Sequence, residues 1–89
     1  MNNKKILEGI EIELRRIKKR QKNFPDHLCA QAGSVTNEAA NLMQAALINK
    51  YSEQFVNTQE LIIYALRTAA MAIRFVENIS KAEKNKIEN

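Results

Sequence analysis

The segment from Leu61 to Val76 constrains the fold most, because its apolar side chains surround most of the circumference of a helix. Such a helix has to be buried on several sides. The chain has 89 residues, so its other helices are too few to cover this segment completely. Arg67 and Arg74 interrupt the segment and make it too short and too polar for a membrane span. We therefore predict an all-α protein in which this helix also packs against a second subunit.

An amphipathic segment comes first in the chain. Leu7, Ile10, Leu14 and Ile17 recur at helical spacing, which predicts a helix over about residues 3–22. The sequence Asn23-Phe24-Pro25-Asp26 breaks it, because the residue before a proline avoids the α region. Proline itself suits the first turn of a helix, so a second helix is predicted to begin at Pro25.

The second predicted helix covers about residues 25–50. Its apolar stripe consists of Leu28, Ala32, Val35, Ala39, Leu42 and Ala46, widened by Met43 and Leu47. Gly33 lies inside this helix, where a glycine is about 1 kcal/mol less favourable than an alanine. We expect the glycine to allow another backbone to approach closely.

The third predicted helix covers about residues 58–80, and Asn57 with Glu60 resembles a capping box at its start. Residues 81–89 form a polar tail that is expected to fray. Residues 1–80 would then form one domain of three antiparallel helices. Two copies would complete a four-helix-type core, which predicts a homo-oligomer with a dimer favoured.

The composition agrees with helices and with a cytoplasmic setting. Two glycines and one proline are too few for a turn-rich β fold. The single cysteine, Cys29, cannot form an internal disulfide and is interpreted as a small, partly buried hydrophobic residue. The basic start of the chain does not resemble a signal peptide.

Three stretches resemble the MazG-like family of all-α NTP pyrophosphohydrolases: Phe24-Pro25-Asp26-His27, residues 35–47 and residues 67–77. The resemblance covers roughly residues 5–80. In that family a helix with the motif E-E-x-x-E and a following helix with E-x-x-D present carboxylates to Mg²⁺ ions, which bind the phosphates of the nucleotide. Residues three or four positions apart share a helix face, and Mg²⁺ prefers oxygen ligands, so this spacing suits the chemistry.

The metal-binding motifs are incomplete in this chain. The first motif falls on residues 37–41, where only Glu38 is acidic and Asn41 is one of two amides. The second falls on Tyr64 and Arg67 or, in an alternative register, on Glu60 and Ile63. The resemblance therefore implies a degenerate, non-catalytic site without a cofactor, and Mg²⁺ would bind only if other ligands replaced the missing ones.

Arg67 is predicted to pair with Glu38 in place of the metal, because a buried carboxylate needs a compensating charge. Tyr64, Arg67, Met71 and Arg74 recur at helical spacing, and internal ion pairs or subunit contacts are favoured for the arginines. The alternative is a nucleotide or another phosphate ligand bound by Arg67 and Arg74. The vestigial substrate-binding site would comprise Glu38, Asn41, Tyr64, Arg67 and Arg74.

The favoured function is that of a non-catalytic MazG-like protein acting by oligomerisation or by binding a ligand or partner. One alternative is an active, metal-dependent nucleotide pyrophosphohydrolase that combines Glu38 with Glu53, Glu60 or a carboxylate of a partner.

A second alternative is nucleic-acid binding by the basic end of the first helix, which carries Arg15, Arg16, Lys18, Lys19, Arg20 and Lys22. These charges also favour the helix dipole without any partner, so nucleic acid is not favoured. Membrane attachment is not expected, because the helix lacks Trp and Phe.

Overall fold

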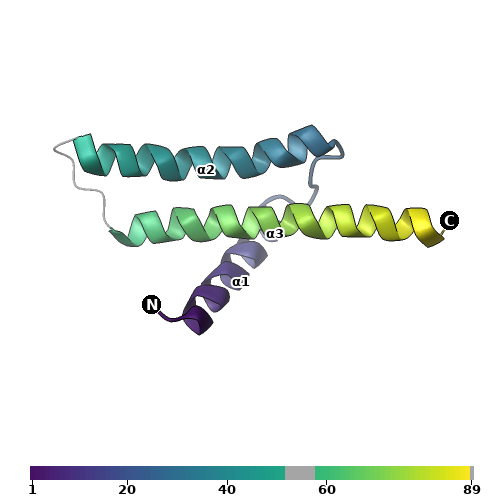
Figure 1. The fold of residues 1–89 in the computed structure, drawn as a ribbon, viewed down its shortest axis with the longest axis horizontal. Helices are drawn as coiled ribbons and strands as arrows, with labels where there is room; N and C mark the ends of the chain where they lie inside the picture. Colours follow the sequence, from purple (N-terminus) through teal and green to yellow (C-terminus); the bar gives the residue numbers. More distant parts are fainter. Residues whose placement is uncertain (52–57, 89) are drawn as a thin grey trace.

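The computed structural model of the chain describes the backbone of residues 1–51 and 58–88 and the side chains of residues 1–50 and 58–83. This part of the chain consists of three α-helices and contains no strand (Figure 1). They are α1 (Asn3–Arg20), α2 (Leu28–Tyr51) and α3 (Thr58–Glu88). The predicted all-α class and the number of helices are confirmed.

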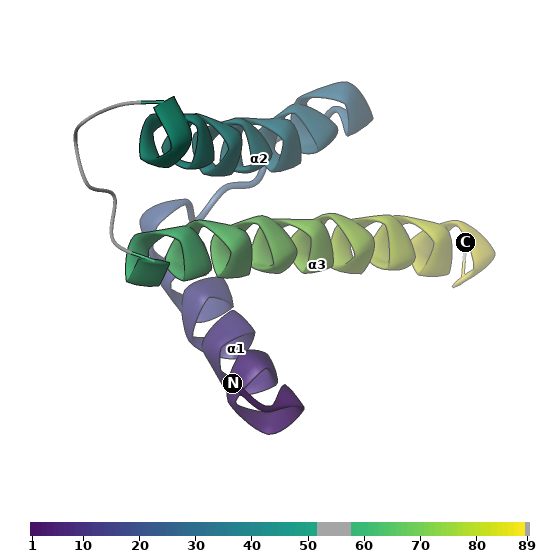
Figure 2. The ribbon, with the colours of Figure 1, turned by 60° about the vertical axis from the view of Figure 1, so that its left-hand side comes forward.

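The long helix α3 is the centre of the fold. It packs against both α1 and α2, whereas those two helices do not pack against each other within the described residues. Helix α2 runs antiparallel beside α3, and α1 crosses α3 obliquely (Figures 1 and 2). The predicted antiparallel arrangement therefore holds for α2 and α3 but not for α1. The molecule is elongated, with extents of 56 × 29 × 19 Å.

The break between α1 and α2 is longer than the sequence predicted. Helix α1 ends at Arg20, and the amide of Gln21 donates to the carbonyl of Ile17 at 2.9 Å. Helix α2 begins at Leu28 instead of Pro25. The Gln31 side chain donates from Nε2 to the Pro25 carbonyl at 2.8 Å, which links the first turn of α2 to the segment before it.

Helix α3 continues past Ser80 to Glu88, so the tail that was predicted to fray is helical. Lysine, alanine and glutamate dominate this stretch and are good helix formers, and no glycine or proline interrupts them. The predicted capping residue Asn57 lies outside the described residues.

The buried core lies where α1 crosses α3. Ile17, Ala70 and Met71 form its centre, surrounded by half-buried Ile10, Leu14, Phe24 and Val35. A Cβ atom at Gly9 would lie 2.9 Å from Cδ1 of Leu66, so Gly9 is the glycine at a close helix contact. A Cβ at Gly33 would meet nothing within 4 Å, so the close approach predicted there is wrong.

Helix α2 turns only part of its apolar surface toward α3. Val35 and Leu42 are half-buried as predicted, together with Glu38, while Gln31 and Ala45 are buried. The other predicted core positions are exposed, and they are Leu28, Ala32, Ala39, Met43, Ala46 and Leu47. Cys29 is also exposed, contrary to the sequence prediction. Within the described ranges no helix is long and apolar enough to cross a membrane.

Candidate ligand-binding cavity

A cavity of about 280 Å³ lies between the end of α1 and the facing sides of α2 and α3. Three of the five predicted site residues line it, namely Glu38, Asn41 and Arg67. The other lining residues are Ile17, Arg20, Gln21, Ser34, Asn37 and Met71. The structure therefore brings most of the predicted site together in one place.

The α2 wall of the cavity is polar. Ser34, Asn37, Glu38 and Asn41 lie within two turns of the helix and share one face. The Ser34 hydroxyl donates to the carbonyl of Ala30 at 3.2 Å, so its hydrogen is used within the helix. Asn37 and Asn41 are exposed, and each amide can both donate and accept hydrogen bonds. This wall can bind a polar ligand without relying on charge.

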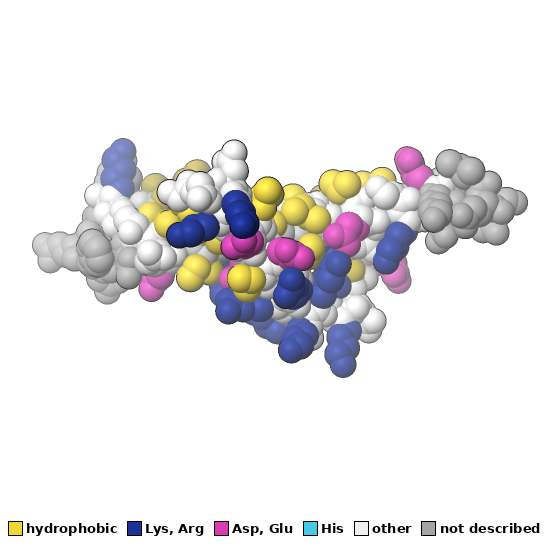
Figure 3. All heavy atoms as spheres, turned by 90° about the horizontal axis from the view of Figure 1, so that it is seen from below, with side chains coloured by type: hydrophobic (Ala, Val, Ile, Leu, Met, Phe, Trp, Pro, Cys, Tyr) yellow, Lys and Arg dark blue, Asp and Glu magenta, His cyan; other side chains and the backbone are white. Residues whose placement is uncertain are grey.

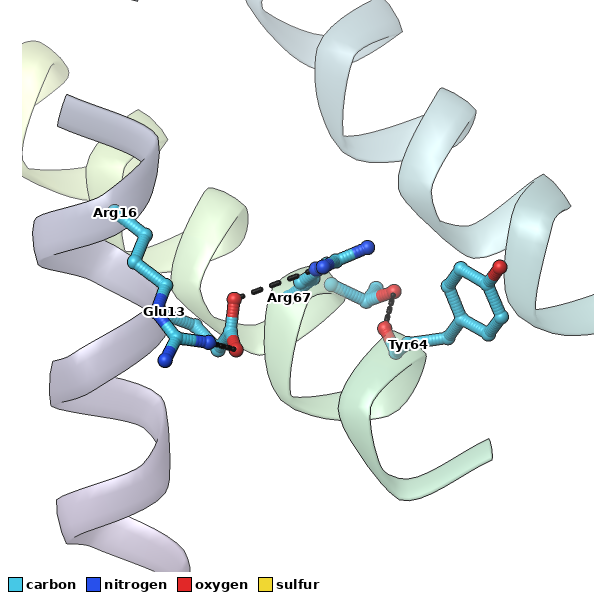
Figure 4. Close-up of polar contacts among 5 residues, drawn as sticks. Glu13, Arg16, Tyr64 and Arg67 are labelled. Atoms are coloured by element: carbon cyan, nitrogen blue, oxygen red, sulfur yellow. Dashed lines mark hydrogen bonds and ion pairs between the residues drawn. The ribbon is translucent and has the colours of Figure 1, made fainter. Parts of the chain in front are cut away.

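Arg67 forms the α3 wall, and its carboxylate partner is Glu13 of α1. Its Nε donates to Oε2 of Glu13 at 3.3 Å, and Nη1 of Arg16 donates to Oε1 at 3.1 Å (Figure 4). Glu13 is only 4% exposed, so its carboxylate needs these cations.

The predicted ion pair between Glu38 and Arg67 is not formed within the described residues, and this prediction is wrong. Arg67 lies where α1 crosses α3, which brings the buried Glu13 within reach of Nε. Glu38 is half-buried in the wall of an open cavity, where water can solvate its carboxylate. The more deeply buried acid therefore takes the cation.

Tyr64 lies next to this cavity and not in it. Its ring centroid is 5.8 Å from Cζ of Arg67, and the ring extends toward α2 (Figure 4). Tyr64 lines a smaller cavity of about 150 Å³ between α2 and α3, which also contains Asn41 and Glu60. Asn41 is thus the residue that both cavities share.

Arg74 lies away from the cavity, so Arg67 and Arg74 do not form one anion clamp. Its Nη2 donates to the carbonyl of Gln21 at 2.6 Å, and its guanidinium stacks on Phe24 with Cζ 4.6 Å from the ring centroid. Burial lowers the pKa of Arg74, and the charge of Glu77 partly opposes this shift. Arg67 forms an internal ion pair, as was favoured from the sequence, whereas Arg74 contacts a carbonyl and a ring and forms no ion pair within the described residues.

Sequence reasoning missed Glu13, although a signal for it was present. Glu13 lies three residues after Ile10 and four before Ile17, on the apolar stripe of the first helix. A carboxylate on a stripe of this kind is buried when the helix packs and then needs a cation nearby. Arg20 was noted only as part of the basic cluster, and its place in the cavity depends on where α2 lies.

The carboxylates proposed for an atypical metal site do not share one cavity. Glu38 lines the larger cavity and Glu60 the smaller one, while Glu53 lies outside the described residues. Among the side chains that the structure places, no group of three His, Cys, Asp or Glu residues could hold a metal ion.

The basic end of α1 is partly neutralised. Arg15 pairs with Glu11 at 3.2 Å, Arg16 with Glu13, and Lys18 with Glu77 of α3 at 2.9 Å. In Figure 3 many of the Lys and Arg side chains lie along the lower middle of the face, with acidic side chains beside them and hydrophobic ones above. Half of the cluster considered for nucleic-acid binding is therefore engaged in ion pairs.

The chain matches no protein-family model, no curated protein and no solved structure.

Proposed function

We propose that this protein is a non-catalytic helical subunit that acts by self-association, as a homodimer related to MazG-like bundles but with changed metal-ligating positions. The observation that carries the proposal is an apolar surface that a single chain leaves open. Met43 of α2 is 61% exposed and Val76 of α3 is 60% exposed. Other large apolar side chains on these helices are also exposed, among them Leu47, Ile62 and Ile73.

Helix α3 has a third apolar face, on which Ile62, Ala65 and Val76 are exposed and Ala69 and Ala72 are half-buried. Ile62, Ala65, Ala69, Ala72 and Val76 follow one another at steps of three and four residues, which is the spacing of a helix–helix seam. We call these five residues the open seam. Its central alanines are small and let another helix approach closely. Beside Val76, an apolar groove of about 500 Å³ includes Ala72 and Ile73.

The exposed apolar residues of α2 form a separate surface. Met43 and Leu47 follow Glu38 by five and nine residues, which is about 140° and 180° around a helix with 3.6 residues per turn. Glu38 lines the cavity between α2 and α3, so Met43 and Leu47 face away from α3. The open seam and the adjacent exposed Ile73 form the apolar layer that a partner can cover.

The surface area of the chain supports a second copy as the occupant of this layer. The accessible surface is 6998 Å², whereas a compact monomer of 10.2 kDa exposes about 5,300 Å². A standard interface buries about 800 Å² on each partner, which this excess can supply. A two-fold axis places the same apolar layer on both subunits and creates a core of four helices.

Sedimentation equilibrium of the wild type and of Val76→Glu tests the proposal. The wild type should have twice the mass of the 10.2 kDa chain, and the variant should be monomeric. Gln44→Glu is the matched control, because Gln44 is an exposed residue of α2 that carries no part of the apolar layer. A monomeric wild type at high concentration, or a control that dissociates like the variant, would refute the dimer.

Ligand binding is the second candidate function, because the cavity of about 280 Å³ is lined by Arg20, Arg67 and two asparagines. We propose a nucleotide or another phosphorylated small molecule as the ligand, with the arginines facing phosphate and the amides facing polar groups. Titration with a nucleoside triphosphate without metal should shift the amide signals of the cavity residues. Arg20→Gln should weaken this binding, and an unchanged affinity would contradict it.

A further inference from the structure

A second recess lies at the turn between α1 and α2, next to the C-terminal half of α3, and has a volume of about 750 Å³. Four cationic side chains line it against two acidic ones, so its charge is positive. The cations are Lys18, Lys22, Arg74 and Lys81, and the acids are Asp26 and Glu77. Two amides, Asn23 and Asn78, add further hydrogen-bonding groups.

Arg74 is the buried cation of this recess, with only 5% of its surface exposed. Its Nη2 donates to the carbonyl of Gln21, and one face of the guanidinium is covered by Phe24. Its Nη1 is buried and has no hydrogen-bond partner within the described residues. A buried donor without an acceptor is costly and uncommon in folded proteins.

The acidic residue nearest in sequence does not satisfy this donor. Glu77 accepts a hydrogen bond from Nζ of Lys18 at 2.9 Å, so its carboxylate already has a cation. Desolvation lowers the pKa of Arg74 despite the opposing charge of Glu77. The described part of the chain thus contains no ion-pair partner for Arg74.

We propose that this recess binds a phosphate-type oxyanion, with Arg74 at its base and Lys22 and Lys81 at its rim. A phosphate group has several oxygens and can accept from Nη1 while it is also contacted by flexible lysines. The Arg74 side chain is held in place by Gln21 and Phe24, so little order has to be gained on binding. The proposal does not depend on self-association, and no residue that lines the recess also lines the cavity of about 280 Å³.

Titration of the full chain with inorganic phosphate at constant ionic strength tests the proposal, with the Nε–H signal of Arg74 and the backbone amides followed by NMR. The wild type should show a saturable shift of the Arg74 signal. The double variant Lys22→Gln/Lys81→Gln should bind about ten-fold more weakly, because two surface charges of the site are lost. Both lysines are exposed, so these substitutions leave the core unchanged.

Two controls separate binding at this recess from general charge effects and from binding in the cavity of about 280 Å³. Lys4→Gln/Lys5→Gln removes the same charge at the distant start of α1, and Arg20→Gln alters the 280 Å³ cavity only. Neither should change the phosphate affinity at Arg74. The proposal is overturned by a response that does not saturate, by equal weakening in either control, or by binding that Lys22→Gln/Lys81→Gln leaves unaltered.

Discussion

The Arg67 guanidinium donates from Nε to Oε2 of Glu13 at 3.3 Å, which links the middle of α3 to α1. Glu13 is nearly inaccessible to water, and its second oxygen accepts from Arg16. Arg67 therefore neutralises a buried acid of the first helix. Its role in the described chain is to hold the α1–α3 crossing together.

Glu13→Gln should lower the free energy of unfolding by about 2 kcal/mol, because the partly buried Arg67 loses the carboxylate of a buried residue, while the exposed Arg16 contributes little. Urea unfolding monitored by circular dichroism measures the change. Glu11→Gln is the matched control, since the Glu11–Arg15 pair is solvent-exposed and should contribute less than about 0.5 kcal/mol. Equal effects of the two substitutions would contradict a special role for Glu13.

Gly33→Ala should raise the free energy of unfolding by about 1 kcal/mol, because alanine favours the helix and its Cβ meets no atom within 4 Å. Gly9→Ala should lack this gain, because its Cβ would lie 2.9 Å from Cδ1 of Leu66 and the side chain would have to move. Thermal unfolding of both variants tests the difference. A larger gain from Gly9→Ala than from Gly33→Ala would show that the helix contact at Gly9 is looser than described.

The melting temperature of the wild type should rise with protein concentration if the proposed dimer forms, because dissociation and unfolding are then coupled. A ten-fold increase should raise it by about 4 °C for a dimer of this size. Calorimetry at two concentrations measures the shift, and Val76→Glu should show none. A concentration-independent melting temperature in the wild type would argue for a folded monomer.

Mg²⁺ or Mn²⁺ should leave the melting temperature unchanged, and nucleoside triphosphates should not be hydrolysed. Glu38 is the only acid among the lining residues of the larger cavity, and Arg67 and Arg20 would repel a cation there. Thermal shift and pyrophosphate-release assays check both statements. Turnover that depends on the metal and disappears in Glu38→Ala would instead support the alternative of an active pyrophosphohydrolase.

Much of the candidate site could be predicted from the sequence, because helical spacing determines which residues of one helix share a face. Glu38 and Asn41 lie on the same wall of the cavity for this reason, and Arg67 faces them from α3. The spacing could not show that Arg74, seven residues after Arg67, would contact the end of α1 instead. That contact depends on where the turn after α1 places Gln21 and Phe24.

Periodicity and the lone proline were sufficient to predict the three helices of the described residues, with a break near Pro25 and a third helix that begins near Thr58, because these signals are local. The tertiary structure alone decided the oblique crossing of α1, the exposure of Met43 and the choice of Glu13 as the partner of Arg67. Each of these depends on the rotation and crossing angle of one helix against another. Wide apolar faces such as that of α2 allow several rotations, so packing selects one of them.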